Sequence, residues 1–427
     1  MPNRIVVLVL SVAPVVLAAS GEDWPQWRGS HRDGVWHETG IQKKFPAEGL
    51  TVRWRAPVGY GFSSPVIAKG RVYVTDVLLD RPKVRGRILC FEEKTGKLLW
   101  TFSREKTNYA QWAFVSGQEP SPNGTPVAQD GRIYATGPQA HNLYCLEAAS
   151  GKLVWERDLA ADYQIEETAT ISASPLVERD RLILQVGGKP DACVVAFDKK
   201  SGREIWRSLN ETAGQASPIL INAGGRRQLV VWTTQSVSCL DPATGGLLWR
   251  EGFSAGNSAA VATPVFSGNR LLVSGLMLKL DEKRPSASVL WPEARAATRR
   301  ILSGTSTPLL QGDYVYSLNQ QGSLVCLDAG TGTQLWETNQ VTRQKSGTSA
   351  CMHMTVNGRL AFIYNEVGEL ILSSLSPQAY EEISRTTLLQ PTYAFGGKKL
   401  TWAAPSFANR CVYARNEREI VCASLKE

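Results

Sequence analysis

The stretch Leu327-Asp328-Ala329-Gly330-Thr331-Gly332-Thr333-Gln334-Leu335-Trp336 occurs in this chain in five related copies. Each copy has an acidic residue, a glycine four residues after it and a tryptophan eight residues after it. The copies end at Trp100, Trp155, Trp206, Trp249 and Trp336. Self-similarity at a spacing of roughly 40 to 55 residues is typical of repeat architectures, so these copies determine the fold class.

The local pattern predicts a tight β-hairpin in each copy. The acid opens the turn, and the glycine takes the left-handed backbone angles that a short hairpin loop requires. The residues on both sides, such as Arg87-Ile88-Leu89-Cys90, are strand formers. The tryptophan in the outgoing strand brings a large apolar surface and an N–H group that needs an acceptor. We therefore expect the tryptophan to pin each sheet to its neighbour.

A small residue followed by proline marks the start of another strand in each repeat. Proline at the first residue of a strand loses no ladder hydrogen bond. The pairs are Ser64-Pro65, Thr125-Pro126, Ser174-Pro175, Ser217-Pro218, Thr263-Pro264, Thr307-Pro308 and Ala404-Pro405. One further repeat begins at Cys351 without the proline, which makes eight repeats.

Each repeat holds four strands, and eight such units predict an all-β, eight-bladed β-propeller of four-stranded blades. The outgoing strands contain Trp54, Trp100, Trp155, Trp206, Trp249, Trp291 and Trp336, with a degenerate strand near Ile383. The last unit has no tryptophan strand of its own, and the Trp54 strand has no preceding hairpin. We therefore predict that an N-terminal strand closes the last blade.

The N-terminus has the pattern of an export signal rather than of a folded element. Arg4 precedes an apolar run, and Ala18-Ala19-Ser20 forms a small-residue cleavage site. The run is short for a membrane span, although a signal anchor is the alternative. We expect a signal peptide at 1–20, a strap at 21–50 and the propeller at 51–427. The mature chain would be periplasmic or extracellular, without a transmembrane span.

Charge and cysteine usage narrow the class of protein further. The net charge of +8 is spread through turns and strand edges, without the basic helix or basic-aromatic cluster of a nucleic-acid-binding protein. Five of the eight cysteines occupy one repeat-equivalent position, which predicts buried small side chains rather than disulfides. They are Cys90, Cys145, Cys239, Cys326 and Cys422. Only Cys411 and Cys422 flank one turn closely enough to suggest a disulfide.

The acid-to-tryptophan phrase resembles the tryptophan-docking repeat of pyrroloquinoline-quinone-type (quinoprotein-type) β-propellers, from Asp23 to the C-terminus. That superfamily includes quinone-dependent alcohol dehydrogenases and a non-enzymatic outer-membrane assembly propeller. The opening Asp23-Trp24-Pro25-Gln26-Trp27-Arg28-Gly29 and the closing Tyr413-Ala414-Arg415-Asn416 resemble a planctomycete-type secreted subgroup. The resemblance implies an exported propeller.

The features that the resemblance implies for a dehydrogenase are not found in the sequence. No two cysteines are adjacent, there is no C-x-x-C-H motif, and the calcium ligands and catalytic Asp are not identifiable. His31, His37, His141 and His353 share no metal-ligand spacing. We therefore expect no catalytic residues, no metal and no cofactor, with pyrroloquinoline quinone and calcium as the alternative.

Candidate binding residues lie in the longest loops between repeats, because propeller loops converge on one face. They are Tyr109, Trp112, Phe114 and Glu119 in the first loop, Tyr163 and Glu166 in the second, and Arg299 and Arg300 in the third. Aromatic and arginine side chains suit a protein partner or a glycan. The structural alternative is that Trp112 and Phe114 pack their loop onto the rim.

Two functions from different classes follow from the sequence. The first is a non-catalytic binding or assembly scaffold of the cell envelope or exterior, with an envelope or extracellular protein as partner. The alternative is a quinone-dependent alcohol or sugar dehydrogenase with a diverged site. A polysaccharide-binding module is a third possibility.

Overall fold

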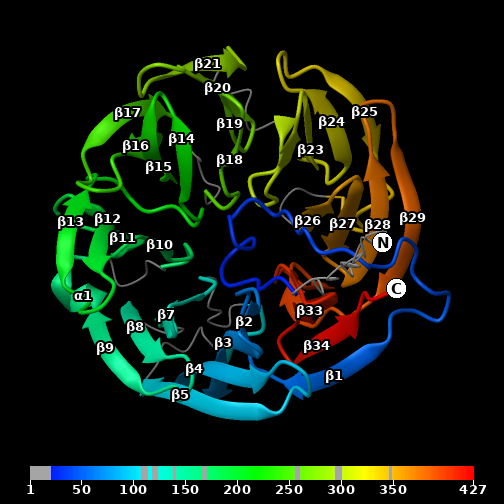
Figure 1. Cartoon of the computed structure of the whole chain (residues 1–427), viewed down its shortest axis with the longest axis horizontal. Coiled ribbons are helices and arrows are strands. Elements are labelled where there is room, and N and C mark those ends of the chain that lie inside the picture. The colour runs from blue at the N-terminus through cyan, green and yellow to red at the C-terminus, as the bar shows by residue number, and fades with distance from the viewer. Residues whose placement is uncertain are drawn as a thin grey trace, which may run out of the picture.

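The computed structural model describes residues 21–106, 114–117, 124–137, 141–165, 171–254, 260–293, 301–345 and 349–427. In these ranges eight four-stranded antiparallel sheets stand around a central axis (Figure 1). The predicted eight-bladed propeller is therefore confirmed. Outside the blades lie only one short helix, α1 (Leu159–Asp162), and one two-stranded hairpin of β30 (Tyr393–Phe395) and β31 (Lys398–Leu400) among the described elements.

The first four blades are consecutive along the chain. Their strands are β2 (Val66–Ala68), β3 (Arg71–Asp80), β4 (Lys83–Glu92) and β5 (Leu98–Lys106); β6 (Val127–Gln129), β7 (Arg132–Thr136), β8 (Asn142–Glu147) and β9 (Leu153–Asp158); β10 (Leu176–Glu178), β11 (Arg181–Gly188), β12 (Ala192–Asp198) and β13 (Glu204–Ser208); and β14 (Ile219–Ala223), β15 (Arg226–Trp232), β16 (Ser236–Leu240) and β17 (Leu247–Gly252).

The last four blades complete the ring. Their strands are β18 (Val265–Ser267), β19 (Arg270–Val273), β20 (Leu276–Leu280) and β21 (Ala287–Trp291); β22 (Leu309–Gln311), β23 (Tyr314–Leu318), β24 (Leu324–Asp328) and β25 (Gln334–Thr338); β26 (Met352–Asn357), β27 (Leu360–Asn365), β28 (Glu369–Leu375) and β29 (Tyr380–Thr387); and β32 (Ser406–Ala408), β33 (Cys411–Arg415), β34 (Glu419–Ser424) and β1 (Val52–Pro57).

The ring closes where the two ends of the chain share the eighth blade. β1 pairs antiparallel with β34, with Trp54 opposite Cys422. The strand order β1-β34-β33-β32 makes β1 the outermost strand of a sheet that otherwise comes from the C-terminus (Figure 1). This confirms the predicted closure by the Trp54 strand.

Tryptophans at the outer strands join each blade to the next. In six of the seven, the indole N–H donates to a backbone carbonyl in the outer hairpin of the following blade. The pairs are Trp54 with Glu93 (2.7 Å), Trp100 with Ala148 (3.2 Å), Trp155 with Lys199 (3.1 Å), Trp206 with Pro242 (3.3 Å), Trp291 with Ala329 (2.9 Å) and Trp336 with Ser376 (2.9 Å). The spacing that recurs in each copy of the phrase therefore positions a contact between blades.

Trp249 is the exception. Its indole N–H donates to Oε1 of Gln228 in its own blade, at 3.1 Å. The next hairpin, between β20 and β21, runs through Asp281 and Ser286 and lacks the glycine of the phrase. Trp249 therefore does not form the hydrogen bond to the next blade that the other tryptophans form. The reason is that the fifth blade has a different turn at this place.

The glycine of the phrase lies directly against the ring of the preceding blade's tryptophan. Gly96 has a φ of +70°, and a Cβ added there would lie 2.5 Å from Trp54. Gly151 has the same relation to Trp100, also at 2.5 Å. Positive φ and close approach both require glycine at these positions. One copy of the phrase thus binds a tryptophan from the blade before and supplies one to the blade after.

The repeated cysteine lies opposite the tryptophan within each blade. Cys90 pairs with Trp100, Cys145 with Trp155, Cys239 with Trp249, Cys326 with Trp336 and Cys422 with Trp54, while Ala196 pairs with Trp206. All these cysteines are buried and free. A small apolar residue here leaves room for the indole, which confirms the packing interpretation.

Cys411 and Cys422 do not form a disulfide in this structure. The register of β33 and β34 places Cys411 opposite Ser424 and Cys422 opposite Tyr413, so the two thiols are not cross-strand partners. Hydrogen bonding by the Cys422 thiol and by Arg53, whose Nη1 lies 3.3 Å from Sγ, lowers the pKa of Cys411 to about 7.

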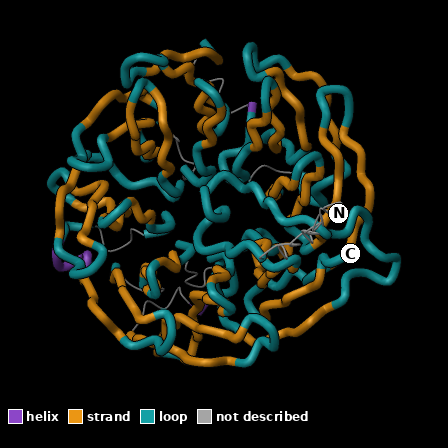
Figure 2. The backbone as a smooth tube through the Cα atoms, in the orientation of Figure 1, coloured by secondary structure: helices purple, strands orange, loops and turns teal. Residues whose placement is uncertain are grey.

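The N-terminal segment crosses the middle of the ring before it reaches β1 (Figure 2). Trp24 exchanges backbone hydrogen bonds with Ile67 of the first blade, and Val35 forms a bridge with Val356 of the seventh. Trp24 and Trp36 are buried against Phe407, with Trp36 also against Phe362. The segment therefore links blades that are far apart in sequence.

We predict that Gly96→Ala lowers the stability of the protein more than Gly70→Ala does. Both glycines have positive φ, but a Cβ at Gly70 meets open space, whereas at Gly96 it meets the Trp54 ring. The backbone strain common to both is about 1 kcal/mol, and overpacking adds about 1–3 kcal/mol at Gly96. Thermal unfolding followed by circular dichroism measures the difference. Equal losses of stability in the two variants would show that the contact between Gly96 and the Trp54 ring does not add to the cost of the substitution.

We also predict that Trp54→Ala weakens the closure of the ring. Loss of a buried tryptophan costs about 3–5 kcal/mol, and here it removes the contact that holds β1 to the first blade. Limited proteolysis should then cleave the segment around β1 earlier than in the parent protein. Trp249→Ala is the matched control, because Trp249 makes its indole hydrogen bond within its own blade. A cleavage pattern shared by both variants would contradict a special role of Trp54.

Candidate functional site

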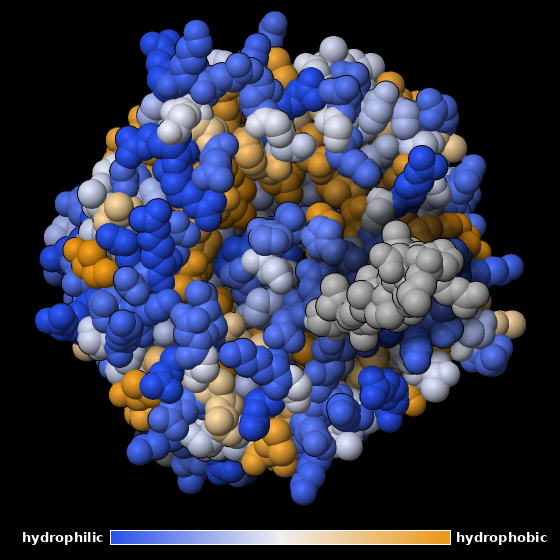
Figure 3. Space-filling view, in the orientation of Figure 1, coloured by the Kyte–Doolittle hydropathy of each residue, from blue (hydrophilic) through white to orange (hydrophobic). Residues whose placement is uncertain are grey.

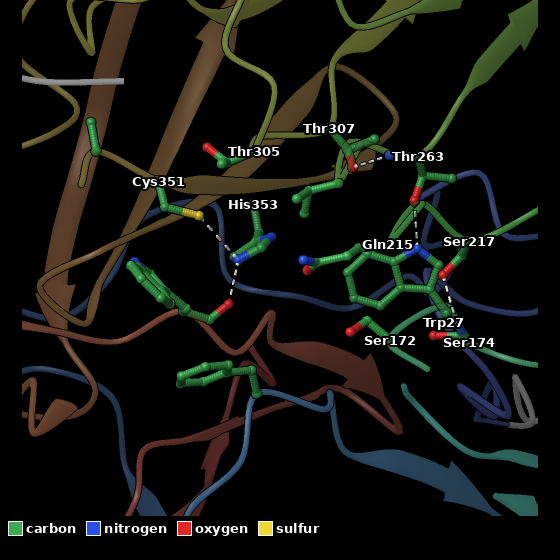
Figure 4. Close-up of a pocket in the computed structure, with 14 residues that line it drawn as sticks. Trp27, Ser172, Ser174, Gln215, Ser217, Thr263, Thr305, Thr307, Cys351 and His353 are labelled. Carbon is green, nitrogen blue, oxygen red and sulfur yellow. Dashed lines mark hydrogen bonds between the residues drawn. The ribbon is translucent and has the colours of Figure 1, made fainter. Parts of the chain in front are cut away.

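A pocket of about 350 Å³ lies on the axis of the propeller (Figure 4). Seven blades contribute described residues to its wall, and Trp27 of the N-terminal segment contributes one side chain. In the space-filling view of one face, hydrophilic residues fill a hollow at the centre, with hydrophobic side chains around it (Figure 3). The pocket lies where segments of seven blades converge on the axis, which makes it the candidate site.

The pocket is built from two repeat-equivalent positions just before the innermost strands. The residue directly before the proline lines it at Ser174, Ser217, Thr263 and Thr307. The residue three before the proline lines it at Phe62, Ser172, Gln215, Val261, Thr305 and Trp402. Because the residue before proline is held in an extended conformation, every second side chain of these segments points the same way, toward the axis.

The residues before the prolines also bind one another around the axis. The backbone N–H of Ser64 donates to Thr125 Oγ1, that of Thr125 to Ser174 Oγ, and that of Ser174 to Ser217 Oγ, each at 3.0 Å. The N–H of Thr263 donates in the same way to Thr307 Oγ1 at 3.1 Å. A hydroxyl at this position therefore joins its blade to the preceding one, since buried backbone N–H groups need acceptors.

The N-terminal segment lies against this ring of hydroxyls. The indole N–H of Trp27 donates to Thr263 Oγ1 at 2.9 Å (Figure 4). The guanidinium of Arg32 donates to the carbonyls of Pro175 at 2.7 Å and Ser174 at 3.3 Å. These bonds hold the segment to the fifth and third blades across the axis.

His353 and Cys351 are the titratable groups in the described wall of the pocket. Burial lowers the pKa of His353 to about 4, so its ring is neutral near pH 7. Its Nε2 lies 2.9 Å from the carbonyl oxygen of Trp402. A carbonyl only accepts, so Nε2 carries the proton and Nδ1 remains an acceptor.

The thiol of Cys351 is also neutral. Its Sγ lies 3.6 Å from Nε2 of His353, and burial raises its pKa to about 12, with the carboxyl of Glu366 adding to the shift. A reactive cysteine needs the opposite, a lowered pKa beside a basic or cationic partner. The pair is therefore not arranged as a nucleophile with its base.

An aromatic wall closes the pocket between the first and eighth blades. The rings of Phe62 and Trp402 lie 5.3 Å apart, and Tyr393 of the β30–β31 hairpin contacts both at 4.8 and 5.5 Å. The hydroxyl of Tyr393 donates to the carbonyl of Gly117 at 3.0 Å. The hairpin thus connects the pocket to the tip of the longest loop.

The donor set of the pocket does not fit a calcium ion with a quinone cofactor. Calcium prefers carboxylate and carbonyl oxygens, and the residues seen to line the pocket include no carboxylate. Its single cysteine is not part of an adjacent pair. Elsewhere among the described residues, no group of three or more His, Cys, Asp or Glu side chains is placed to hold a metal.

Of the predicted loop residues, the structure describes only Phe114 and Tyr163, and they differ in burial. Phe114 is half-buried, with the guanidinium carbon of Arg81 5.9 Å from its ring centroid. Tyr163 is only 3% exposed; it packs against Phe197 and donates its hydroxyl to Glu204 at 2.8 Å. Tyr163 therefore belongs to the core and not to an exposed binding surface. The remaining candidates lie outside the described residues: Tyr109, Trp112, Glu119, Glu166, Arg299 and Arg300.

The residues that form the pocket were not among the predicted site residues. The Ser-Pro and Thr-Pro pairs were noted as strand starts, but not as a ring of hydroxyls. A usable signal was present, because the residue three before each proline changes from repeat to repeat, in the order Phe62, Asn123, Ser172, Gln215, Val261, Thr305 and Trp402. Variable side chains at a fixed place in a repeat are a mark of a lining surface rather than of packing.

Within the described residues there is no helix with the length and hydrophobicity needed to cross a membrane.

Among curated proteins, the chain is similar to outer membrane protein assembly factors. It is 25% identical over 234 residues to BamB of Moranella endobia, covering 50% of this chain and 56% of that protein. It is 25% identical over 288 residues to BamB of Burkholderia pseudomallei, covering 66% of this chain and 58% of that protein. The chain thus spans somewhat more than half the length of these two relatives.

A second class of relatives is enzymatic. The chain is 24% identical over 255 residues to the quinoprotein alcohol dehydrogenase PedH of Pseudomonas putida, covering 53% of this chain and 40% of that protein. This similarity is as low as that to the assembly factors, so identity alone does not choose between the two classes.

Solved structures share the fold at low identity. BamB from Moraxella catarrhalis matches with a TM-score of 0.57 and 16% identity, over 88% of this chain and 98% of that one. The quinohemoprotein alcohol dehydrogenase from Comamonas testosteroni matches with a TM-score of 0.66 and 14% identity, over 94% of this chain and 80% of that one. At such identities the likeness concerns the propeller alone.

The sequence profile of one family covers most of the propeller. The family described as outer membrane protein assembly factor BamB matches residues 46–189 and 190–367, which is more than half of the chain. The two matched segments include the first six blades and part of the seventh. The chain therefore belongs to the outer membrane protein assembly factor BamB family.

Proposed function

We propose that this protein is a non-catalytic binding or assembly scaffold of the cell envelope or exterior, which binds a protein through the loops on one face of the propeller. One observation carries the proposal. The described wall of the axial pocket holds no carboxylate, and its histidine and cysteine are both kept neutral by burial. Among the described residues of this cavity there is thus no carboxylate base and no activated nucleophile, and His353 is only a weak base because burial lowers its pKa to about 4.

Family membership supports the envelope as the place of action, since the matching family is an outer membrane assembly factor. The segment at 1–20, which lies outside the described residues, has the pattern of a signal peptide. The two together support export to the periplasm or the exterior. An envelope or extracellular protein is accordingly the partner that we propose.

The described tip of the longest loop has the chemistry of a protein contact. Val115 is 49% exposed, beside the half-buried ring of Phe114 and the guanidinium of Arg81. Aromatic and arginine side chains are enriched among the residues that dominate binding energy at interfaces, and an exposed aliphatic side chain next to them adds apolar area to bury. The bond from Tyr393 to Gly117 anchors this tip to the β30–β31 hairpin.

A second candidate function is a pyrroloquinoline-quinone-dependent alcohol or sugar dehydrogenase. The similarity to PedH over about half of the chain favours it. The composition of the pocket wall opposes it, because the described residues of that wall include no carboxylate to bind calcium or to act as a base.

We predict that Val115→Glu abolishes capture of the partner. Purified protein, cross-linked in an envelope extract, should retain a protein that the variant loses, because a charge in the centre of an apolar contact is costly. Val154→Glu is the matched control, since Val154 is similarly exposed, at 39%, but lies on the outer strand β9. Equal capture by both variants would place the contact elsewhere on the surface.

We further predict no enzymatic gain on reconstitution. Addition of pyrroloquinoline quinone and calcium to the purified protein should leave dye-linked oxidation of ethanol and glucose at the background rate. Activity above background that His353→Ala removes would overturn the scaffold proposal in favour of the dehydrogenase.

A further inference from the structure

We propose that the axial pocket binds a neutral carbohydrate of one or two pyranose rings. This inference goes beyond the scaffold function, because it concerns a small ligand on the axis and not the loops that would contact a protein. The volume of about 350 Å³ lies at the lower end of the range for small-molecule sites, about 300–1,000 Å³. Such a volume suits a mono- or disaccharide.

Four hydroxyl oxygens in the wall each accept one hydrogen bond from within the protein. Ser174, Ser217 and Thr307 each accept a backbone N–H, and Thr263 accepts the indole N–H of Trp27. None of the four donates its own proton to another residue that the structure describes. A hydroxyl oxygen has one proton and two lone pairs, so each can still donate once and accept once. Sugar hydroxyls, which also donate and accept, match this capacity.

Two further polar groups extend the set. In Figure 4 the side chain of Gln215 reaches into the pocket, where its amide can both donate and accept. The Nδ1 atom of His353 adds an acceptor without a proton, because Nε2 donates to Trp402. These groups come from the fourth and seventh blades, so they approach a ligand from different directions.

The aromatic side of the pocket lies across the ring from the hydroxyls. The four hydroxyls belong to the third to sixth blades, whereas Phe62 and Trp402 precede the first and eighth, which are neighbours. The two rings lie 5.3 Å apart and form one apolar wall. A pyranose has an apolar C–H face and a rim of hydroxyls. It can therefore place its face on the aromatic wall and its rim against the polar one.

The absence of charge in the described wall selects a neutral ligand. None of the described residues that line the pocket is Asp, Glu, Lys or Arg, and His353 is neutral near pH 7. A charged ligand would lose its hydration without a counter-charge in the wall.

Two arginines of the N-terminal segment lie close to the ring of hydroxyls. Arg28 and Arg32 donate to the backbone carbonyls of Arg32, Asp33, Ser174 and Pro175. Their guanidinium groups hold the segment in place rather than line the cavity. Burial lowers their pKa to about 10 and about 9, which leaves both charged at pH 7. An anionic ligand is therefore the competing outcome that the experiment must separate.

The test uses saturation-transfer NMR and calorimetry on the purified full chain. The neutral probes are D-glucose, maltose and cellobiose, and the anionic probes are D-glucuronate and inorganic phosphate. We expect at least one neutral probe to bind, and D-glucuronate to bind at least about tenfold more weakly than D-glucose.

The variant Gln215→Leu keeps the side-chain size and removes the amide. It should weaken binding of the neutral probe roughly three- to tenfold, the worth of one or two neutral hydrogen bonds. Gln334→Leu is the matched control, because Gln334 is exposed on the outer strand β25 and far from the axis. The control should bind as the parent protein does, and thermal unfolding verifies that both variants are folded.

Three results would overturn the inference. Failure of all three neutral probes to bind excludes a carbohydrate pocket, and tighter binding of glucuronate or phosphate than of glucose makes it an anion site. Parent-like affinity in a folded Gln215→Leu variant places the sugar elsewhere. None of these results bears on capture of a protein partner, so the scaffold proposal is tested separately.

Discussion

The contact between the tryptophan of one blade and the glycine turn of the next is the constraint on which the ring depends. The indole lies flat on a glycine with positive φ and donates to a carbonyl of the same turn, as Trp54 does at Gly96 and Glu93. The two halves of this contact come from different blades. Among the seven outer-strand tryptophans only Trp249 donates its indole N–H within its own blade, so stability grows by addition of neighbours, as in other repeat proteins. Sharing of the eighth blade between the two termini supplies the last neighbour.

At the inner ends of the blades, smaller groups also form hydrogen bonds between neighbouring blades. Four of the residues before a proline donate their N–H to the hydroxyl of the next blade, for example from Thr125 to Ser174. Since proline removes a donor and holds its predecessor extended, this position is free to bind laterally. The hydroxyls that join the blades are therefore also part of the polar wall of the axial pocket.

Family membership and pocket chemistry lead to a consistent interpretation of function. The chain belongs to an outer membrane assembly factor family and shares its fold with alcohol dehydrogenases. In the described wall of the pocket, the groups that could titrate, His353 and Cys351, are buried and neutral near pH 7. Blade number and shape are common to both classes and so carry no information about chemistry.

The sequence by itself determined the blades, their count, the position of each tryptophan and the closure by β1, because each depends on a pattern within about 50 residues that recurs along the chain. It did not determine the pocket, whose parts come from seven blades and the N-terminal segment; Trp27 and Thr263 are 236 residues apart. Nor did it show that Tyr163 is core, since an aromatic residue in a loop has the same sequence pattern whether it packs inward or outward. Only the tertiary structure decided which side chains meet on the axis, because the angle between successive blades, and not the local chain, brings them together.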